Sequence, residues 1–313
     1  MVYHVLIFSG VGSVEGLGTY DVYAFFVLSG FALAHVYPAG FDVRRFAVAR
    51  IARIVPLYIL ASIATIALTG TTLTIVLLNV TGLFALWRPG VSSIPDGGWS
   101  IAIELVLYLL FPVLSVLSTR WLAVLFVASL VMRVVYVQAV WPQGVALAEV
   151  WSPYTQLPSF LVFFVGGMLG ARVRLRSLGG WPFFVGVAIF GSIVVALQVA
   201  GLRDAMTGWL GIGLVLLTVA GVLLAASGGG WTGWSARVAE TLGALSYPVY
   251  LLHFVVWATL GMLGLAIEGQ ILGTVLGTPI LAAIVHAGFE VPVGRWIRFL
   301  GQPRRPPLPV VRV

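Results

Sequence analysis

Cysteine and lysine are absent from this 313-residue sequence, and charged residues make up only 9% of it. The absence of cysteine excludes disulfide bonds, thiol nucleophiles and cysteine-ligated metals. The scarcity of charge, together with 60% hydrophobic residues and a mean hydropathy of +1.08, excludes a soluble domain. The apolar runs also lack the alternating polar residues of transmembrane β-strands, which excludes a membrane β-barrel.

Apolar stretches long enough to cross a membrane recur along the whole chain. A helix needs about 17–25 such residues to cross a hydrocarbon core of ~30 Å. The sequence therefore predicts an all-α, polytopic transmembrane helix bundle with about nine full spans. These spans are expected at residues 22–38, 52–69, 99–117, 121–139, 156–172, 181–200, 206–227, 241–263 and 270–289. Residues 71–87, interrupted by Asn79 and Gly82, are predicted to be interfacial or re-entrant instead.

The two ends of the chain differ from the spans. We expect one membrane-embedded domain over residues 1–301, followed by a Pro- and Arg-rich cytoplasmic tail over residues 302–313. A short first helix ends near Ser9, and the residues before the loop at 10–18 rise only about 13 Å. Because that is less than half a bilayer, the first helix is expected to be truncated at its N-terminal side.

All 17 basic residues are arginines, and the formal net charge is +7. Clusters of Arg in short loops are typical of cytoplasmic loops beside anionic lipid, whereas nucleic-acid binding needs a continuous basic surface. The sequence therefore predicts a lipid partner, no nucleic acid, and cytoplasmic Arg-rich loops. The arginines placed on that side are Arg44, Arg45, Arg50, Arg53, Arg120, Arg172, Arg174, Arg176, Arg237, Arg295, Arg298, Arg304, Arg305 and Arg312. Arg88, Arg133 and Arg203 fall elsewhere.

Glu104 lies near the start of the apolar run from Trp99 to Pro112. An ionisable group at membrane depth costs free energy unless it faces a polar cavity or a partner, so Glu104 is a candidate functional residue. The alternative is a carboxylate that only caps or hydrogen-bonds its own helix near the interface.

His4 is the second candidate. Near neutral pH an imidazole can take or give a proton, which makes it a natural general base for a hydroxyl acceptor. The alternative is a packing histidine. His4 and Glu104 each lie about five residues from the outer end of their helices, so both are predicted about 8 Å below the outer surface.

Arg50 and Arg53 are three residues apart and therefore share one helix face at the cytoplasmic side. Such a pair can bind phosphate groups bidentately. Positive-inside anchoring explains Arg44 and Arg45 fully, but it explains Arg53 less well because Arg53 lies one turn into the apolar span.

Two further segments carry polar groups inside apolar helices. Ser29 and Gly30 permit either a close backbone approach between helices or a kink. Tyr247, Tyr250 and His253 are spaced by three residues and lie near one face of their helix. A packing or hydrogen-bonding role is the simplest interpretation of each.

Together these segments resemble the acyltransferase 3 family of integral membrane acyltransferases. The matching residues, in family order, are His4, Phe25 to Phe31, Arg50, Arg53, Pro56, Trp99, Ser100, Glu104, Tyr108, Pro112, Ser246, Tyr247, Tyr250, Leu251, His253, Glu290 and Pro292. They cover nearly the whole chain. Each block is weakly specific, whereas six blocks in order are strongly specific.

The resemblance implies transfer of an acyl group, commonly acetyl, from cytoplasmic acyl-coenzyme A to a hydroxyl of an envelope or exported glycan or a related acceptor. It implies that His4 is catalytic and that the paired arginines Arg50 and Arg53 serve the acyl donor. Arg45, in the same basic segment, is a further candidate for the donor site. The sequence departs from the family pattern in two places. The basic residue expected eleven positions before His4 is missing, and Tyr23 stands where the family often has Asp.

We therefore predict a bacterial inner-membrane O-acyltransferase with no bound cofactor and no metal, and acyl-coenzyme A as co-substrate. His4 would act as general base, while Glu104 orients its imidazole or holds acceptor hydroxyls; direct transfer and an acyl-histidine intermediate both stay open. Supporting residues for the acceptor pocket are Ser29, Trp99, Ser100, Tyr108, Tyr247, His253 and Glu290. The competing interpretations are a transporter or flippase of an acylated glycan, and a catalytically dead relative.

Overall fold

Helices form the whole of the described architecture. The computed structural model describes residues 1–10, 15–173, 180–229 and 232–301, and it contains no β-strand within them. The predicted all-α class is therefore confirmed. The predicted tail and two of the arginines assigned to the cytoplasm, Arg174 and Arg176, lie outside the described residues.

Seven helices in the described ranges are long and apolar enough to cross a membrane. They are α2 (Glu15–Val36), α3 (Val43–Thr69), α6 (Gly98–Ser115), α7 (Thr119–Val140), α12 (Gly208–Ser227), α13 (Gly233–Met262) and the continuous run of α14 (Ile267–Val285), the π-helical turn η3 (His286–Glu290) and α15 (Val291–Leu300). The other two predicted spans correspond to α9 (Leu161–Arg172), which has only 12 residues, and to α10 (Trp181–Ala200). The nine predicted spans thus correspond to the seven helices above together with α9 and α10.

The remaining elements are short. They are α1 (Val2–Phe8), α4 (Leu73–Thr81), the 3₁₀ turn η1 (Leu83–Ala85), α5 (Pro89–Ser92), α8 (Trp151–Tyr154), the 3₁₀ turn η2 (Leu157–Ser159) and α11 (Leu202–Met206). Helix α4 has nine residues and ends at Gly82, whose φ of +75° suits glycine. Nine residues rise about 14 Å, so this segment does not cross, in agreement with the expectation for residues 71–87.

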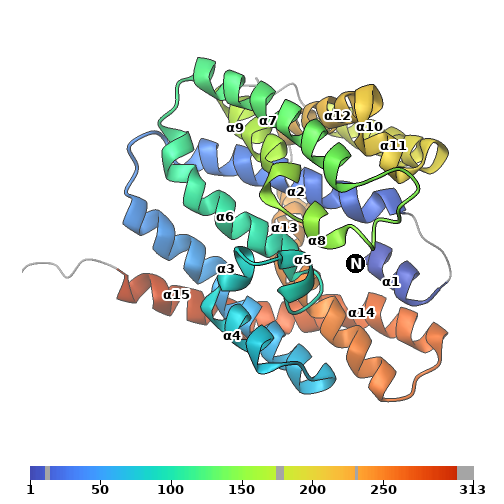
Figure 1. Cartoon of the computed structure of the whole chain (residues 1–313). Coiled ribbons are helices and arrows are strands. Elements are labelled where there is room, and N and C mark those ends of the chain that lie inside the picture. The colour runs from blue at the N-terminus through green and yellow to red at the C-terminus, as the bar shows by residue number, and fades with distance from the viewer. Residues whose placement is uncertain (11–14, 174–179, 230–231, 302–313) are drawn as a thin grey trace, which may run out of the picture.

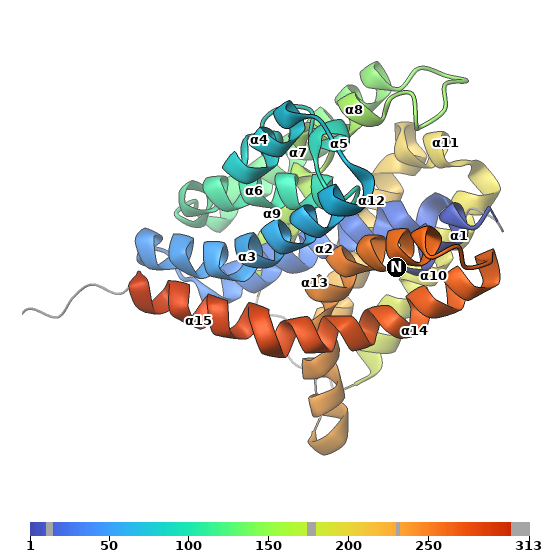
Figure 2. The same ribbon diagram turned by 90° about the horizontal axis from the view of Figure 1, so that it is seen from below.

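The helices pack around α2, which lies in the middle of the bundle (Figure 1). Helices α6, α7 and α9 lie on one side of α2 in the view of Figure 2, and α10 to α12 gather at one edge in that of Figure 1. Helices α14 and α15 form a curved rod along another side, and one end of α13 extends beyond the other helices (Figure 2). Helix α1 contacts α2 and α14, so the N-terminus lies beside the C-terminal helices.

Helices α2 and α9 approach with their backbones in contact because glycines face each other's carbonyls. A Cβ at Gly30 would clash with the carbonyl oxygen of Phe164, and a Cβ at Gly167 would clash with that of Val27. The predicted close approach at Ser29-Gly30 is therefore confirmed. Small residues at such crossings favour helix association in membranes, where the hydrophobic effect does not drive it.

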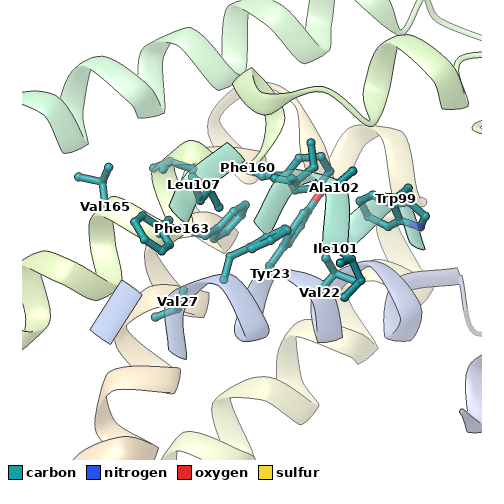
Figure 3. Packing of buried hydrophobic residues seen from close by; sticks show 14 of the residues in the cluster. Val22, Tyr23, Val27, Trp99, Ile101, Ala102, Leu107, Phe160, Phe163 and Val165 are labelled. Atoms are coloured by element: carbon teal, nitrogen blue, oxygen red, sulfur yellow. The ribbon is translucent and has the colours of Figure 1, made fainter. Parts of the chain in front are cut away.

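The core contains a fully buried arginine. Arg133 on α7 donates hydrogen bonds from Nη1 to the Ser159 carbonyl (2.6 Å) and from Nη2 to the Tyr23 hydroxyl (2.9 Å). Tyr23 stacks on Phe163 with ring centroids 4.1 Å apart, in the middle of the apolar cluster that Figure 3 shows. No carboxylate among the described residues pairs with Arg133. This arginine, an exception to the predicted loop pattern, is thus a core residue held by a tyrosine and a carbonyl.

Candidate active site

Two histidines from opposite ends of the chain meet in the bundle. His4 on α1 and His253 on α13 are joined by a hydrogen bond of 3.0 Å between Nδ1 of His4 and Nε2 of His253. Nδ1 of His253 lies 3.1 Å from the Val249 carbonyl oxygen. Because a carbonyl can only accept, Nδ1 of His253 carries the hydrogen and its Nε2 accepts from Nδ1–H of His4. In this tautomer the lone pair of His4 lies on Nε2, where a general base needs it.

The start of α6 is tied to α13 close to the histidine pair. The Tyr250 hydroxyl donates to the Gly97 carbonyl (2.7 Å) and lies 2.8 Å from the Ser100 hydroxyl. Tyr250 is three residues before His253 on the same helix, and their ring centroids are 6.2 Å apart. We call His4, His253, Tyr250 and Ser100 the histidine cluster.

Glu104 lies one turn farther along α6 and is buried, with 5% of its surface exposed. Its carboxylate accepts a hydrogen bond from the Tyr108 hydroxyl, and Ser29 is a hydrogen-bonding neighbour of Tyr108. Glu104 also lies within electrostatic range of Arg50 and Arg53. His253 accepts a hydrogen bond from the His4 imidazole, because α13 brings a second imidazole beside α1. The sequence argument expected Glu104 either to orient that imidazole or to hold acceptor hydroxyls.

The Arg53 guanidinium faces the C-terminal helices. Its Nη1 donates to Oε1 of Glu290 at 2.6 Å, and the other carboxylate oxygen of Glu290 lies 2.7 Å from Nδ1 of His286. Glu290 is only 4% exposed, whereas Arg53 is 37% exposed. The π-helical turn η3 carries both His286 and Glu290, and such turns recur at functional sites. Glu290 was predicted only as a supporting residue; the structure makes it the ionic partner of Arg53.

The Arg50 guanidinium is enclosed by aromatic rings rather than by carboxylates. Its Cζ lies 5.7 Å, 5.9 Å and 5.8 Å from the ring centroids of Tyr37, Phe46 and Tyr108. Among the described residues its Nε is buried without a hydrogen-bond partner. Arg45 is exposed near the start of α3, and its backbone N–H donates to the Asp42 carboxylate, which caps the helix. We call Arg50, Arg53, Glu104, Tyr108 and Glu290 the arginine cluster.

Two cavities adjoin the clusters. The larger has a volume of about 320 Å³, and His4, Asp96, Trp99 and Tyr250 are among its lining residues. The smaller has a volume of about 200 Å³ and is lined by residues that include Ser100 and Tyr247. Both cavities share Asp21, Val22 and Tyr250, so they are neighbours.

Tyr247 links the smaller cavity to the arginine cluster. Its ring centroid lies 5.7 Å from Cζ of Arg53, and its hydroxyl donates to the Ile54 carbonyl (2.7 Å). Tyr247 and His253 are six residues apart on α13, a rise of about 9 Å. One helix therefore connects the arginine side with the histidine pair.

Sequence reasoning missed two polar groups of this region, His286 and Asp96. His286 and Glu290 have the i, i+4 spacing that could have suggested their contact. Asp96 precedes α6 in a Pro-Asp-Gly turn, and nothing local indicated that it lines the same cavity as His4. No group of three or more His, Asp or Glu side chains in the described part of the chain is arranged to hold a metal ion.

Comparisons with known proteins identify the family of the chain. The acyltransferase domain of the acyltransferase 3 family matches residues 1–288. The chain is also similar to "Acyltransferase MdmB" of Streptomyces mycarofaciens, with 27% identity over 269 residues that cover 77% of this chain and 68% of that protein. No solved structure gives a significant match. Because the family match spans the histidine and arginine clusters almost entirely, the chain belongs to the acyltransferase 3 family of membrane acyltransferases.

Proposed function

We propose that the chain transfers an acyl group, acetyl in the simplest case, from cytoplasmic acyl-coenzyme A to a hydroxyl of an envelope or exported glycan or a related acceptor. The observation that carries this proposal is the hydrogen bond between His4 and His253 at a cavity wall. This hydrogen bond fixes the tautomer of His4 with the basic lone pair on Nε2, and no carboxylate is needed to orient the ring.

His4 is the general base in this proposal. Its Nε2 takes the proton of the acceptor hydroxyl while the hydroxyl oxygen attacks the thioester carbonyl. The carbon–sulfur bond then breaks, coenzyme A leaves as the thiol after taking up the proton, and the acceptor keeps the acyl group as an ester. His253 fixes the ring orientation and tautomer of His4 and is a positioning residue.

The arginine cluster is the proposed donor site. A guanidinium fork matches phosphate oxygens bidentately, and the Nε of Arg50 lacks a partner among the described residues. Arg53 would bind a second phosphate group while Glu290 holds its side chain in place. In the proposed orientation the start of α3, with Arg45, faces the cytoplasm, and the membrane is the bacterial inner membrane.

The smaller cavity would accept the acyl end of the donor. It lies between Tyr247, which contacts Arg53, and Tyr250, which lies beside His253. Glu104 follows Ser100 by one turn of α6 and would hold Tyr108 against the Arg50 guanidinium.

Membranes that contain the protein, incubated with acetyl-labelled acetyl-coenzyme A, test the function. We expect label in an ester of the glycan or small-molecule fraction, and we expect Glu104→Gln to reduce that label strongly. The label is then released by mild alkali, as an ester requires. Movement of unlabelled glycan across the membrane without any ester label would contradict the proposal and favour a transporter.

A further inference from the structure

The cavity beside His4 has a strongly aromatic wall with acidic groups in it. Its lining residues include Trp99, Trp151, Tyr250 and Phe254, and two carboxylates, Asp21 and Asp96. The Trp99 and Trp151 rings pack edge to face with centroids 5.1 Å apart. No arginine is among the described lining residues. A cation is attracted both to aromatic faces and to carboxylates, whereas an anion is repelled by both.

The two carboxylates are not equivalent. Asp21 on α2 lines both cavities, whereas Asp96, in the turn before α6, lines only the larger one. Asp96 makes no hydrogen bond or ion pair with any described residue. Asp96 is exposed at its surface, but neighbouring side chains remove part of the water around its carboxyl group and raise its pKa, because a charge that has lost water is less stable. The same loss of water strengthens the attraction of this carboxylate for a cation.

Asp96 is also placed to act on the acceptor rather than on the donor. It lies in the turn before α6, one residue before Gly97, whose carbonyl accepts the Tyr250 hydroxyl. That hydrogen bond fixes the turn against the helix that carries His253. Arg50 and Arg53 do not line this cavity, so the phosphate groups of the donor and the carboxylate of Asp96 are kept apart.

We propose that Asp96, with the indoles of Trp99 and Trp151, binds a positively charged group of the acceptor, so that the favoured acceptor carries an amine-derived cation beside its reacting hydroxyl. The inference rests on the proposed function, because the hydroxyl must reach Nε2 of His4. Asp96 is thereby a specificity-determining residue, and anionic glycans are poor acceptors.

Binding of labelled choline to the purified full-length protein in detergent tests this proposal without any acyl transfer. Choline carries a cation two carbons from a hydroxyl. Its neutral isostere is 3,3-dimethylbutan-1-ol, which has the same shape without the charge. We expect choline to bind, tetramethylammonium to compete, and the neutral isostere to compete about tenfold less well.

Three variants complete the experiment. Asp96→Asn is expected to reduce choline binding about tenfold, Asp96→Glu to keep most of it, and Glu240→Gln, which removes an exposed charge on α13, to leave it unchanged. Thermal unfolding of each variant checks that it is folded. Absence of choline binding to the wild type, equal competition by the neutral isostere, or full binding by folded Asp96→Asn would each overturn the inference. If the function proposal fails but this one holds, choline binds normally and no ester forms.

Discussion

The histidine cluster and the arginine cluster of this membrane bundle differ in how their polar groups are stabilised: the first by hydrogen bonds between uncharged groups, the second by opposite charges. His4 and His253 are two imidazoles joined by a single hydrogen bond, with a backbone carbonyl as the last acceptor. The arginine cluster instead holds two guanidinium groups and two carboxyl groups, with the ion pair between Arg53 and Glu290 at 2.6 Å. A neutral pair can take up a proton without first breaking an ion pair. The charged cluster leaves the Nε of Arg50 without a partner among the described residues, so this group can receive an anionic ligand.

This difference predicts how substitutions in each cluster should affect turnover and stability. Loss of a histidine leaves neutral neighbours behind, so turnover should fall while the fold survives. Loss of an arginine strands a buried charge, so stability and donor binding should both suffer.

Replacement of His4 by alanine should have the largest effect. We expect kcat for acyl transfer to fall about 10²- to 10⁴-fold, the usual contribution of a general base. The melting temperature should change little. His35→Ala, which alters an exposed histidine on α2, is the matched control and should keep wild-type turnover. Comparable turnover in His4→Ala and His35→Ala would remove His4 from the reaction.

Replacement of Arg53 by methionine should destabilise the protein. Glu290 is 4% exposed and would keep only His286 as a partner. Leaving such a group unpaired costs about 1–3 kcal/mol. Thermal unfolding in detergent measures this, and the double variant Arg53→Met, Glu290→Met should recover most of the loss without recovering donor binding. An unchanged melting temperature in the single variant would show that the ion pair contributes nothing.

Replacement of His253 by alanine should lower kcat about tenfold to a hundredfold, since a misplaced base loses most of its advantage. KM for the acyl donor should stay near its wild-type value, because the arginine cluster is untouched. His253→Gln, whose side-chain oxygen can accept from Nδ1–H of His4, should restore part of the turnover. A packing role alone predicts no difference between the two variants once both are folded.

Replacement of Arg50 by lysine should have the smallest effect and should appear mainly in KM. Lysine keeps the charge but loses the planar fork that binds phosphate bidentately. We expect KM for the acyl donor to rise about tenfold with kcat little changed, the mark of uniform binding. A fall in kcat with unchanged KM would instead place Arg50 in the chemical step.

The sequence was sufficient for the helices, but not for the pairing of the polar residues within them. Long apolar runs decide where helices form because lipid leaves the backbone no alternative. The two decisive contacts, His4 with His253 and Arg53 with Glu290, join residues 249 and 237 positions apart. Nothing local records such a pairing, which depends on how α1, α3, α13 and η3 are arranged in space.

Arg133 is a second case in which the sequence did not reveal the partners of a polar side chain. Counting arginines by loop made it an exception, because the rule considers only charge and depth. Its two hydrogen bonds, to Ser159 and Tyr23, come from segments 26 and 110 residues away. A buried guanidinium is tolerated when such acceptors are supplied, and their supply becomes visible only in three dimensions.

The π-helical turn between α14 and α15 sets the phase of the last helix. A π turn holds one residue more than an α turn, so deletion of one residue within 286–290 would rotate α15 by about 100° relative to α14. Gly294, where a Cβ would lie 2.9 Å from the Ala52 carbonyl oxygen, would then no longer face α3. The extra residue thus sets the rotation of α15 about its axis, so that Glu290 faces Arg53 and, one turn later, Gly294 faces the backbone of α3.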